Sequence, residues 1–244
     1  MKWIAVALGV VAVLGCVTVA AFGLAGAAWS RASAGIREEM LDGRADPAPV
    51  SAVRPDAGDV PAPVARYLAR SVPQDAEPIG VARLQQEGEF QMGQGPQGWR
   101  PFTAAQVVRA YPPAFLWDAR ISMGPLMTVR VRDGYHDGQG GMTAKLGGLV
   151  TVMNAPPTPE LARAALERYL AEAPWTPSRL LPGNGLVWRP VDDSSAVATL
   201  TDGDVSVSVT VSFDGDGDIV GALVPDRGRE VDGDFVPTPW VGRF

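Results

Sequence analysis

The stretch that decides the fold is Val205-Ser-Val-Ser-Val-Thr-Val-Ser-Phe213, in which an apolar residue alternates with serine or threonine. Successive side chains of a β-strand point to opposite faces, so this segment places five apolar residues on one face and small hydroxyl residues on the other. One buried face and one solvent-exposed face are typical of antiparallel sheets. We therefore predict an antiparallel sheet whose apolar face covers the core.

Three other segments show the same alternation of apolar and polar residues. They are residues 82–92, 117–123 and 127–133. In the second of these segments, Trp117 and Ile121 fall on one face, whereas Asp118 and Arg120 fall on the other. These segments predict further strands of a strongly curved antiparallel sheet with one face turned to the core.

Three segments instead have helical spacing. The strongest is residues 158–173, with Thr158 as the N-cap, Pro159 at the first helical position and Pro174 ending the helix. Shorter helices are predicted over residues 61–68 and 103–111. The predicted fold class is therefore α+β, with a curved antiparallel sheet packed on two or three helices.

An uncharged stretch of 27 residues covers residues 3–29, between Lys2 and Arg31. About 20 apolar residues cross the ~30 Å hydrocarbon core of a bilayer, whereas the apolar part of a signal peptide has about 7 to 15 residues. The length predicts a transmembrane anchor in residues 1–30. Residues 25–27 (AGA) fit a signal-peptidase site and residues 13–16 (VLGC) resemble a lipid-attachment signal, so a cleaved signal peptide and a lipidated Cys16 are the alternatives.

The rest of the chain is exported under each of these three interpretations. A short tail ahead of the first apolar segment is typical of a signal anchor, so we expect a single-pass protein of the cell membrane with the bulk of its chain outside the cytoplasm. Residues 31–60, rich in Pro, Ala and Asp, predict a flexible linker. The folded extracytoplasmic domain is predicted over residues 61–244.

Composition excludes several classes of protein and site. With 46% apolar and 20% charged residues, most of the chain is not disordered. A single Cys and a single His, His136, exclude a disulfide framework and a Cys/His zinc site. A net charge of −6 without a basic stripe argues against a nucleic-acid partner. We predict no cofactor and no catalytic residue.

Five blocks of sequence carry a resemblance to a known family. They are residues 86–90 (QEGEF), 98–104 (GWRPFTA), 112–115 (PPAF) with 117–120 (WDAR), 168–172 (RYLAE) and 236–244 (VPTPWVGRF). Over residues 60–244, the chain resembles a family of uncharacterised, membrane-anchored extracytoplasmic proteins of bacteria. That family is similar at the fold level to the periplasmic lipoprotein carriers.

The resemblance implies an open half-barrel that closes over helices and receives acyl chains. It also implies more strand-like sequence after the last block, whereas this chain stops at Phe244. A half-barrel without its closing strands has an unpaired edge. We therefore expect a domain that is truncated at its C-terminal end or marginally stable.

The candidate ligand site combines apolar and basic residues of the predicted sheet. Its members are Phe90, Trp117, Ile121, Met123, Met127, Arg120, Arg130 and Arg132. Aromatic and Met side chains suit a cavity for an apolar chain, and the three arginines would present planar guanidinium forks to an anionic headgroup. The alternative is a solvated face on which the arginines pair with Asp118 and other acids.

Asp214, Asp216 and Asp218 have the spacing that opens a calcium loop. A calcium loop of the EF-hand type also needs Gly at its sixth position and Glu at its twelfth, and this chain has Ile219 and Pro225 there. A Gly-rich hairpin turn is therefore the favoured interpretation, and we predict no metal site.

The function predicted from these observations is a membrane-anchored binding domain that holds a lipid or another amphiphile on a concave apolar face. Its partners would be the membrane, through residues 3–29, and that ligand. The alternatives are a protein-interaction scaffold of the cell envelope, and a hydrolase that uses carboxylates alone. Such a hydrolase would need two acids facing each other, and the sequence pairs none.

Overall fold

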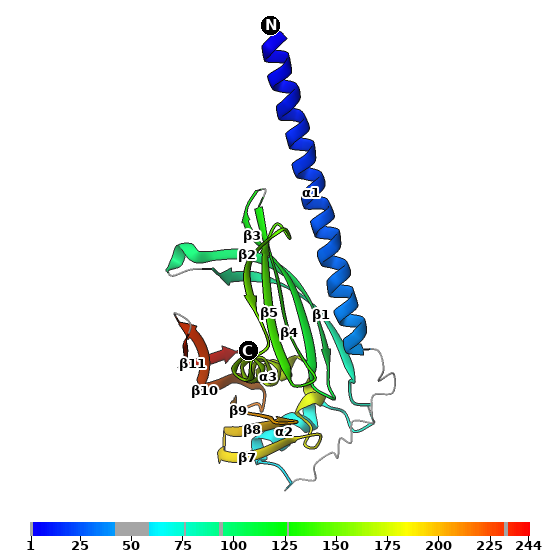
Figure 1. Cartoon of the computed structure of the whole chain (residues 1–244). Coiled ribbons are helices and arrows are strands. Elements are labelled where there is room, and N and C mark those ends of the chain that lie inside the picture. Colours follow the sequence, from blue (N-terminus) through cyan, green and yellow to red (C-terminus); the bar gives the residue numbers. More distant parts are fainter. Residues whose placement is uncertain (1, 42–58, 76, 93–94, 126, 232–233) are drawn as a thin grey trace.

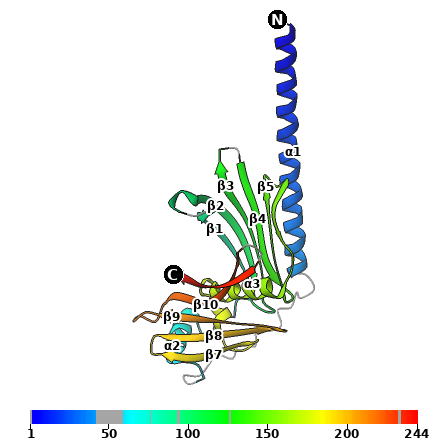
Figure 2. The same ribbon diagram turned by 60° about the vertical axis from the view of Figure 1, so that its left-hand side comes forward.

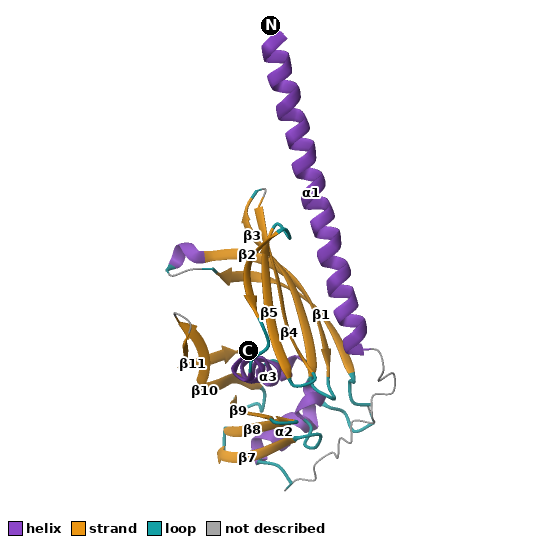
Figure 3. Ribbon diagram, in the orientation of Figure 1, coloured by secondary structure: helices purple, strands orange, loops and turns teal. Residues whose placement is uncertain are grey.

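The computed structural model describes residues 2–41, 59–75, 77–92, 95–125, 127–231 and 234–244. It contains three α-helices and two antiparallel sheets (Figures 1 and 3). The six-stranded sheet follows chain order and comprises β1 (Val81–Gln91), β2 (Trp99–Arg109), β3 (Ala114–Gly124), β4 (Met127–His136), β5 (Gln139–Leu146) and β6 (Val150–Ala155). The five-stranded sheet comprises β7 (Leu186–Asp192), β8 (Ser195–Asp202), β9 (Val205–Phe213), β10 (Ile219–Val231) and β11 (Asp234–Arg243).

Helix α3 (Pro159–Ala171) lies between the two sheets and packs against β5, β9 and β10 (Figure 1). The predicted N-cap is confirmed, because the Thr158 hydroxyl accepts a hydrogen bond from the backbone N–H of Leu161 at 3.1 Å. The helix buries Leu166, Tyr169 and Leu170. Helix α2 (Ala62–Ser71) packs beside the five-stranded sheet.

A single hydrophobic core joins both sheets through these helices. Ile121 and Val207 belong to this cluster and the half-buried Leu84 packs against it, so the apolar faces predicted from the alternation do meet. The α+β prediction is confirmed in this coarse sense. The strands form two sheets rather than one curved sheet, because α3 and the turns that follow it interrupt the chain between β6 and β7.

The prediction of a helix over residues 103–111 is wrong, because most of that segment belongs to β2. Val108 is buried in the main core, and Val107 is buried in a second cluster with Met40 and Leu116 on the opposite face of the sheet. A strand that is covered on both faces loses the apolar–polar alternation, and its apolar residues then resemble those of a buried helix.

Helix α1 (Lys2–Leu41) is continuous and has two distinct halves (Figure 2). Its N-terminal half projects beyond the six-stranded sheet, and Leu24 is still 74% exposed. Its C-terminal half lies along the outer face of that sheet, where Trp29, Ser33 and Met40 are buried at helical spacing.

The predicted flexible linker over residues 31–60 is therefore wrong for its first part. Residues 31–41 are helical and packed on the sheet, and residues 42–58 lie outside the described part of the chain. Among the described helices, α1 is the one that is long and apolar enough to cross a membrane, with a mean hydropathy of 2.4 over its most apolar window. Signal sequences share that length and composition.

Candidate functional site

The main candidate site is a cavity of about 630 Å³ on the inner face of the six-stranded sheet. Apolar side chains from β1, β3, β4, β5 and β6 form one wall, and α3, β10 and β11 contribute to the other. Four charged residues also line it, namely Asp133, Arg168, Glu172 and Arg227. The cavity is thus apolar over most of its surface and charged at a few positions, which is typical of small-molecule sites.

The apolar wall runs from exposed side chains to fully buried ones. Phe90 and Met153 are 40% and 49% exposed, whereas Trp117 and Ile121 are buried. The rings of Phe90, Phe102 and Trp117 contact one another with centroid separations of 5.9 to 6.4 Å. Because exposure decreases along this wall, an apolar chain could enter at Phe90 and Met153 and pack against Trp117.

A chain of hydrogen bonds lies behind the aromatic cluster. The indole N–H of Trp117 donates to Gln86 Oε1 at 2.7 Å, and Gln86 Nε2 donates to Gln106 Oε1 at 2.9 Å. Gln106 Nε2 then donates to Glu172 Oε2 at 2.8 Å. These hydrogen bonds connect β3, β1 and β2 to the end of α3, so they fix the orientation of the Trp117 indole.

Arg168 connects this row of hydrogen bonds to a second carboxylate, that of Asp133. Its Nε donates to Glu172 Oε1 at 2.7 Å and its Nη1 donates to Asp133 Oδ2 at 2.6 Å. The guanidinium also lies over the Trp117 ring, 4.9 Å from its centroid. Arg168 therefore neutralises two carboxylates and contacts the deepest aromatic ring of the cavity.

Burial and neighbouring charges shift the pKa values of Asp133 and Arg168. Burial raises the pKa of Asp133 above its usual range, although the charge and the hydrogen bond of Arg168 oppose that shift. Burial alone would lower the pKa of Arg168, but the charges of Glu172 and Asp133 outweigh it and raise that pKa. The arginine therefore stays charged.

A β-bulge turns Arg227 toward the cavity. Val224 pairs with Trp240 and Arg227 pairs with Thr238, so β10 has one residue more than β11 between these pairs. In a regular strand, residues three positions apart point to opposite faces. The extra residue of the bulge places the side chain of Arg227 on the same face of the sheet as that of Val224. The Arg227 guanidinium lies 5.7 Å from the centroid of the Trp240 ring.

Arg227 differs from Arg168 in its polar contacts. Within the described part of the chain, no carboxylate lies within ion-pair distance of Arg227, and its side chain makes no hydrogen bond. Burial is the main reason that its pKa is lowered. The cavity wall therefore carries a guanidinium that can accept an anionic partner.

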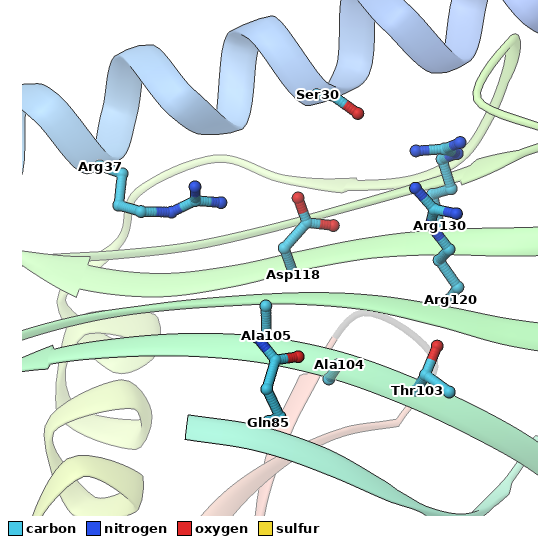
Figure 4. Close-up of a pocket in the computed structure, with 9 residues that line it drawn as sticks. All are labelled: Ser30, Arg37, Gln85, Thr103, Ala104, Ala105, Asp118, Arg120 and Arg130. Atoms are coloured by element: carbon cyan, nitrogen blue, oxygen red, sulfur yellow. The ribbon is translucent and has the colours of Figure 1, made fainter. Parts of the chain in front are cut away.

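The structure separates the eight predicted ligand residues into three groups. Phe90, Trp117 and Ile121 line the cavity. Met123 and Met127 do not line it, because they are exposed near the end of the β3–β4 hairpin. The remaining three residues, Arg120, Arg130 and Arg132, lie on the opposite face of the sheet, toward α1 (Figure 4). The predicted apolar and basic residues therefore do not form one site.

Arg132 holds α1 on this outer face. Its Nε donates to the Ser33 hydroxyl at 3.1 Å, its Nη2 donates to the Trp29 carbonyl at 3.2 Å, and its guanidinium covers the Trp29 ring at 4.3 Å. The Trp29 indole N–H in turn donates to Asp118 at 2.9 Å. Among the described residues, Asp118 makes no ion pair with Arg120, Arg130 or Arg132, although its charge opposes the lowering of the pKa of Arg130 and Arg132 by burial.

A second pocket, of about 340 Å³, lies between α1 and the outer face of the sheet. Figure 4 shows Arg120 and Arg130 side by side, with their guanidinium groups toward the helix. Arg37 extends from the helix toward the carboxylate of Asp118. This polar pocket is distinct from the apolar cavity, because the sheet separates them.

Sequence reasoning missed the polar residues of the cavity and of the hydrogen-bond network behind it. They are Gln86, Gln106, Asp133, Arg168, Glu172 and Arg227. One signal was present for two of them, because Gln86 and Asp133 occupy positions of their strands that the alternation assigns to the apolar face. A polar residue on that face must find a hydrogen-bonding partner, so such positions indicate a buried network.

The aspartates of residues 214–218 form a hairpin turn between β9 and β10. The Asp214 carboxylate accepts hydrogen bonds from the backbone N–H groups of Asp216 and Asp218, at 3.0 and 2.9 Å. Within the ranges that the structure describes, no cluster of three His, Cys, Asp or Glu side chains is arranged to hold a metal ion. The geometry is that of a turn stabilised by its own aspartate.

Comparison with known proteins identifies a family but no function. The model of a family of unknown function (DUF6920) matches residues 58–244, which is most of the chain, so the protein belongs to that family. No curated protein and no solved structure matches the chain.

Proposed function

We propose that this member of the family is a membrane-anchored binding protein that holds an amphiphile in the apolar cavity. The apolar chain of the ligand would pack on the aromatic wall, and its anionic head would bind Arg227. One observation carries this proposal: a cavity of about 630 Å³ is apolar over most of its surface, yet presents a guanidinium that has no ion-pair partner among the described residues.

The size and the polarity of the cavity support a ligand rather than a simple core. Small-molecule sites have volumes of roughly 300 to 1,000 Å³, and well-packed interiors leave few voids larger than a water molecule. Each methylene buried in such a site contributes about 0.8 kcal/mol. The scaffold alternative needs a filled interior, so the volume of the cavity favours a ligand.

The hydrolase alternative has less support, although Asp133 and Glu172 both face the cavity. Both oxygens of Glu172 accept hydrogen bonds, one from Arg168 and one from Gln106. A general base needs a free lone pair directed at its substrate. The two carboxylates therefore serve better to hold Arg168 and the Trp117 indole in place than to transfer protons.

In this proposal α1 is a retained anchor that crosses the membrane once and leaves the bulk of the chain outside the cytoplasm. The exposed apolar half of α1 supports the anchor. A reporter enzyme fused after Phe244 tests the sidedness. Activity of a reporter that works only outside the cytoplasm is expected, and activity of a cytoplasmic reporter at the same position would overturn the assignment.

Native mass spectrometry and uptake of a fluorescent fatty acid by the full chain test the ligand. Ala144→Phe fills part of the cavity, because Ala144 is buried on its wall. Excluding two methylenes of the probe lowers its affinity at least about tenfold. The control is Ser208→Phe, which adds the same ring to the exposed face of β9.

Two outcomes of that experiment would contradict the proposal. One is a wild-type chain that retains no ligand and takes up no probe. The other is an Ala144→Phe variant that binds the probe as tightly as the Ser208→Phe variant does, because the probe would then occupy a different site.

A further inference from the structure

We propose that Arg120 and Arg130 form a second site, which binds the phosphate group of an anionic phospholipid at the bilayer surface. The site is the polar pocket between α1 and the outer face of the six-stranded sheet (Figure 4). This inference rests on the membrane-spanning role of α1 in the proposed function, but not on the ligand of the apolar cavity.

The first argument is the register of the sheet, which places three cations side by side. Arg120 pairs directly with Arg130, and Arg130 pairs directly with Lys145, so one row across β3, β4 and β5 is entirely basic. Like charges opposite each other on neighbouring strands are destabilising. A bound anion between the arginines removes that repulsion.

The second argument is that these cations lack protein partners. Within the described ranges, none of the three makes an ion pair or a side-chain hydrogen bond. The carboxylate nearest to them in the pocket, that of Asp118, accepts a hydrogen bond from Trp29. Two unpaired guanidinium groups offer planar forks that match the oxygens of a phosphate.

The third argument is the position of this row along α1. The uncharged apolar segment from Trp3 to Leu24 has 22 residues, which at about 1.5 Å per residue span roughly 33 Å, close to the ~30 Å hydrocarbon core. Gly26, two residues further on, lies directly over Arg130, because a Cβ atom there would be 2.9 Å from Arg130 Nη2.

That position corresponds to the headgroup layer of the membrane. Two residues of helix add about 3 Å beyond the hydrocarbon core, and the headgroup layer on each side is roughly 5 to 8 Å thick. Phosphate groups lie in this layer. A lipid phosphate can therefore reach the pair Arg120 and Arg130 without leaving the bilayer.

The test uses the full chain in nanodiscs that contain equal amounts of phosphatidylcholine and phosphatidylglycerol. Native mass spectrometry of the chain released from them counts the retained lipids. We expect phosphatidylglycerol to be enriched, and the double variant Arg120→Gln/Arg130→Gln to lower that enrichment about tenfold or more, because hydrogen bonds to charged groups are lost. The control is Arg189→Gln/Arg243→Gln, which removes two exposed arginines of the five-stranded sheet and should keep the enrichment.

Folding of the double variant is checked by its Tm in lipid-free detergent. That Tm should equal or exceed the wild-type value, because two like charges on neighbouring strands are removed. A second arm titrates inorganic phosphate into the wild type under the same conditions. If inorganic phosphate raises the wild-type Tm as much as phosphatidylglycerol does, the site binds free phosphate and the lipid proposal is overturned.

Failure of this proposal can be distinguished from failure of the proposed function. A chain that stays in the membrane pellet on alkaline extraction and takes up the fatty acid, but retains both lipids equally, overturns the phosphate site alone. A chain that is released into the soluble fraction overturns both the anchor and the phosphate site.

Discussion

Replacing Arg168 by Met is the most direct test of the charged network in the cavity. Methionine keeps an apolar side chain beside Trp117 but leaves Asp133 and Glu172, which are largely buried, without their cation. Removing one partner of a buried ion pair costs about 3 to 5 kcal/mol. For a domain of this size, each kcal/mol lowers Tm by roughly 2 to 4 °C, so we expect Tm to fall by roughly 6 to 20 °C.

The pH dependence of this loss identifies its cause. Burial already raises the pKa of Asp133, and without the opposing charge and hydrogen bond of Arg168 that pKa is raised further in the folded state. A carboxyl group whose pKa is higher in the folded state destabilises the fold above that pKa, and this penalty disappears as the pH falls below the pKa of the unfolded state. The difference in Tm between the Arg168→Met variant and the wild type should therefore shrink as the pH is lowered.

Thermal unfolding of the full chain in detergent, followed by circular dichroism at neutral and acidic pH, measures both effects. The variant Arg168→Met/Asp133→Asn/Glu172→Gln should recover most of the lost stability, because its amides need no cation. Arg66→Met is the control, since the hydrogen bond of Arg66 to a backbone carbonyl is exposed. A loss below about 1 kcal/mol, or one that is the same at both pH values, would refute the network as the cause.

Two further substitutions test the packing of the fold. Trp29→Ala removes a buried ring and its hydrogen bond to Asp118, at a cost of about 3 to 5 kcal/mol. The amides of residues 30–41 should therefore exchange faster with deuterium. The control is Trp99→Ala, which removes a half-exposed ring and should leave that exchange unchanged. Equal exchange in the two variants would contradict the docking of α1. Gly140→Ala places a Cβ atom 2.5 Å from the carbonyl oxygen of Leu161 where β5 crosses α3, and should lower stability by about 1 to 3 kcal/mol. Gly215→Ala meets nothing within 4 Å and should not lower it, so equal Tm values would argue against this close crossing.

The sequence predicted individual elements better than their pairing. Alternation identified β3, β4 and β9 and the face that each buries, and the capping residues located α3. The alternation of apolar and polar residues indicates which side chains of a strand are buried, but not which neighbouring strand it pairs with. The division into two sheets depends on where α3 inserts, and that is decided by packing.

The docked half of α1 was hidden for a different reason. Its buried positions include Gly26 and Ser33, which are not apolar, and its strongest contacts reach strand residues about 90 to 100 positions later in the chain, such as Asp118 and Arg132. A search for apolar periodicity does not detect an interface that depends on one tryptophan, small residues and an arginine. The same limit explains why Arg168 and its two carboxylates were missed, because they come from β4 and α3.

For the proposed membrane-anchored function, the docking of α1 changes how the cavity would be held relative to the bilayer. A flexible linker over residues 31–60 would let the domain move over distances of roughly 30 Å, from about 5 to 6 Å times the square root of its length. In the structure, the C-terminal half of α1 is itself packed on the sheet that forms the cavity wall. On β3, Asp118 holds the helix while its neighbour Trp117 faces the cavity. In the proposed function, where α1 is the membrane anchor, the strand that holds the helix is thus also the strand that lines the cavity, and this would fix the height of the cavity above the bilayer.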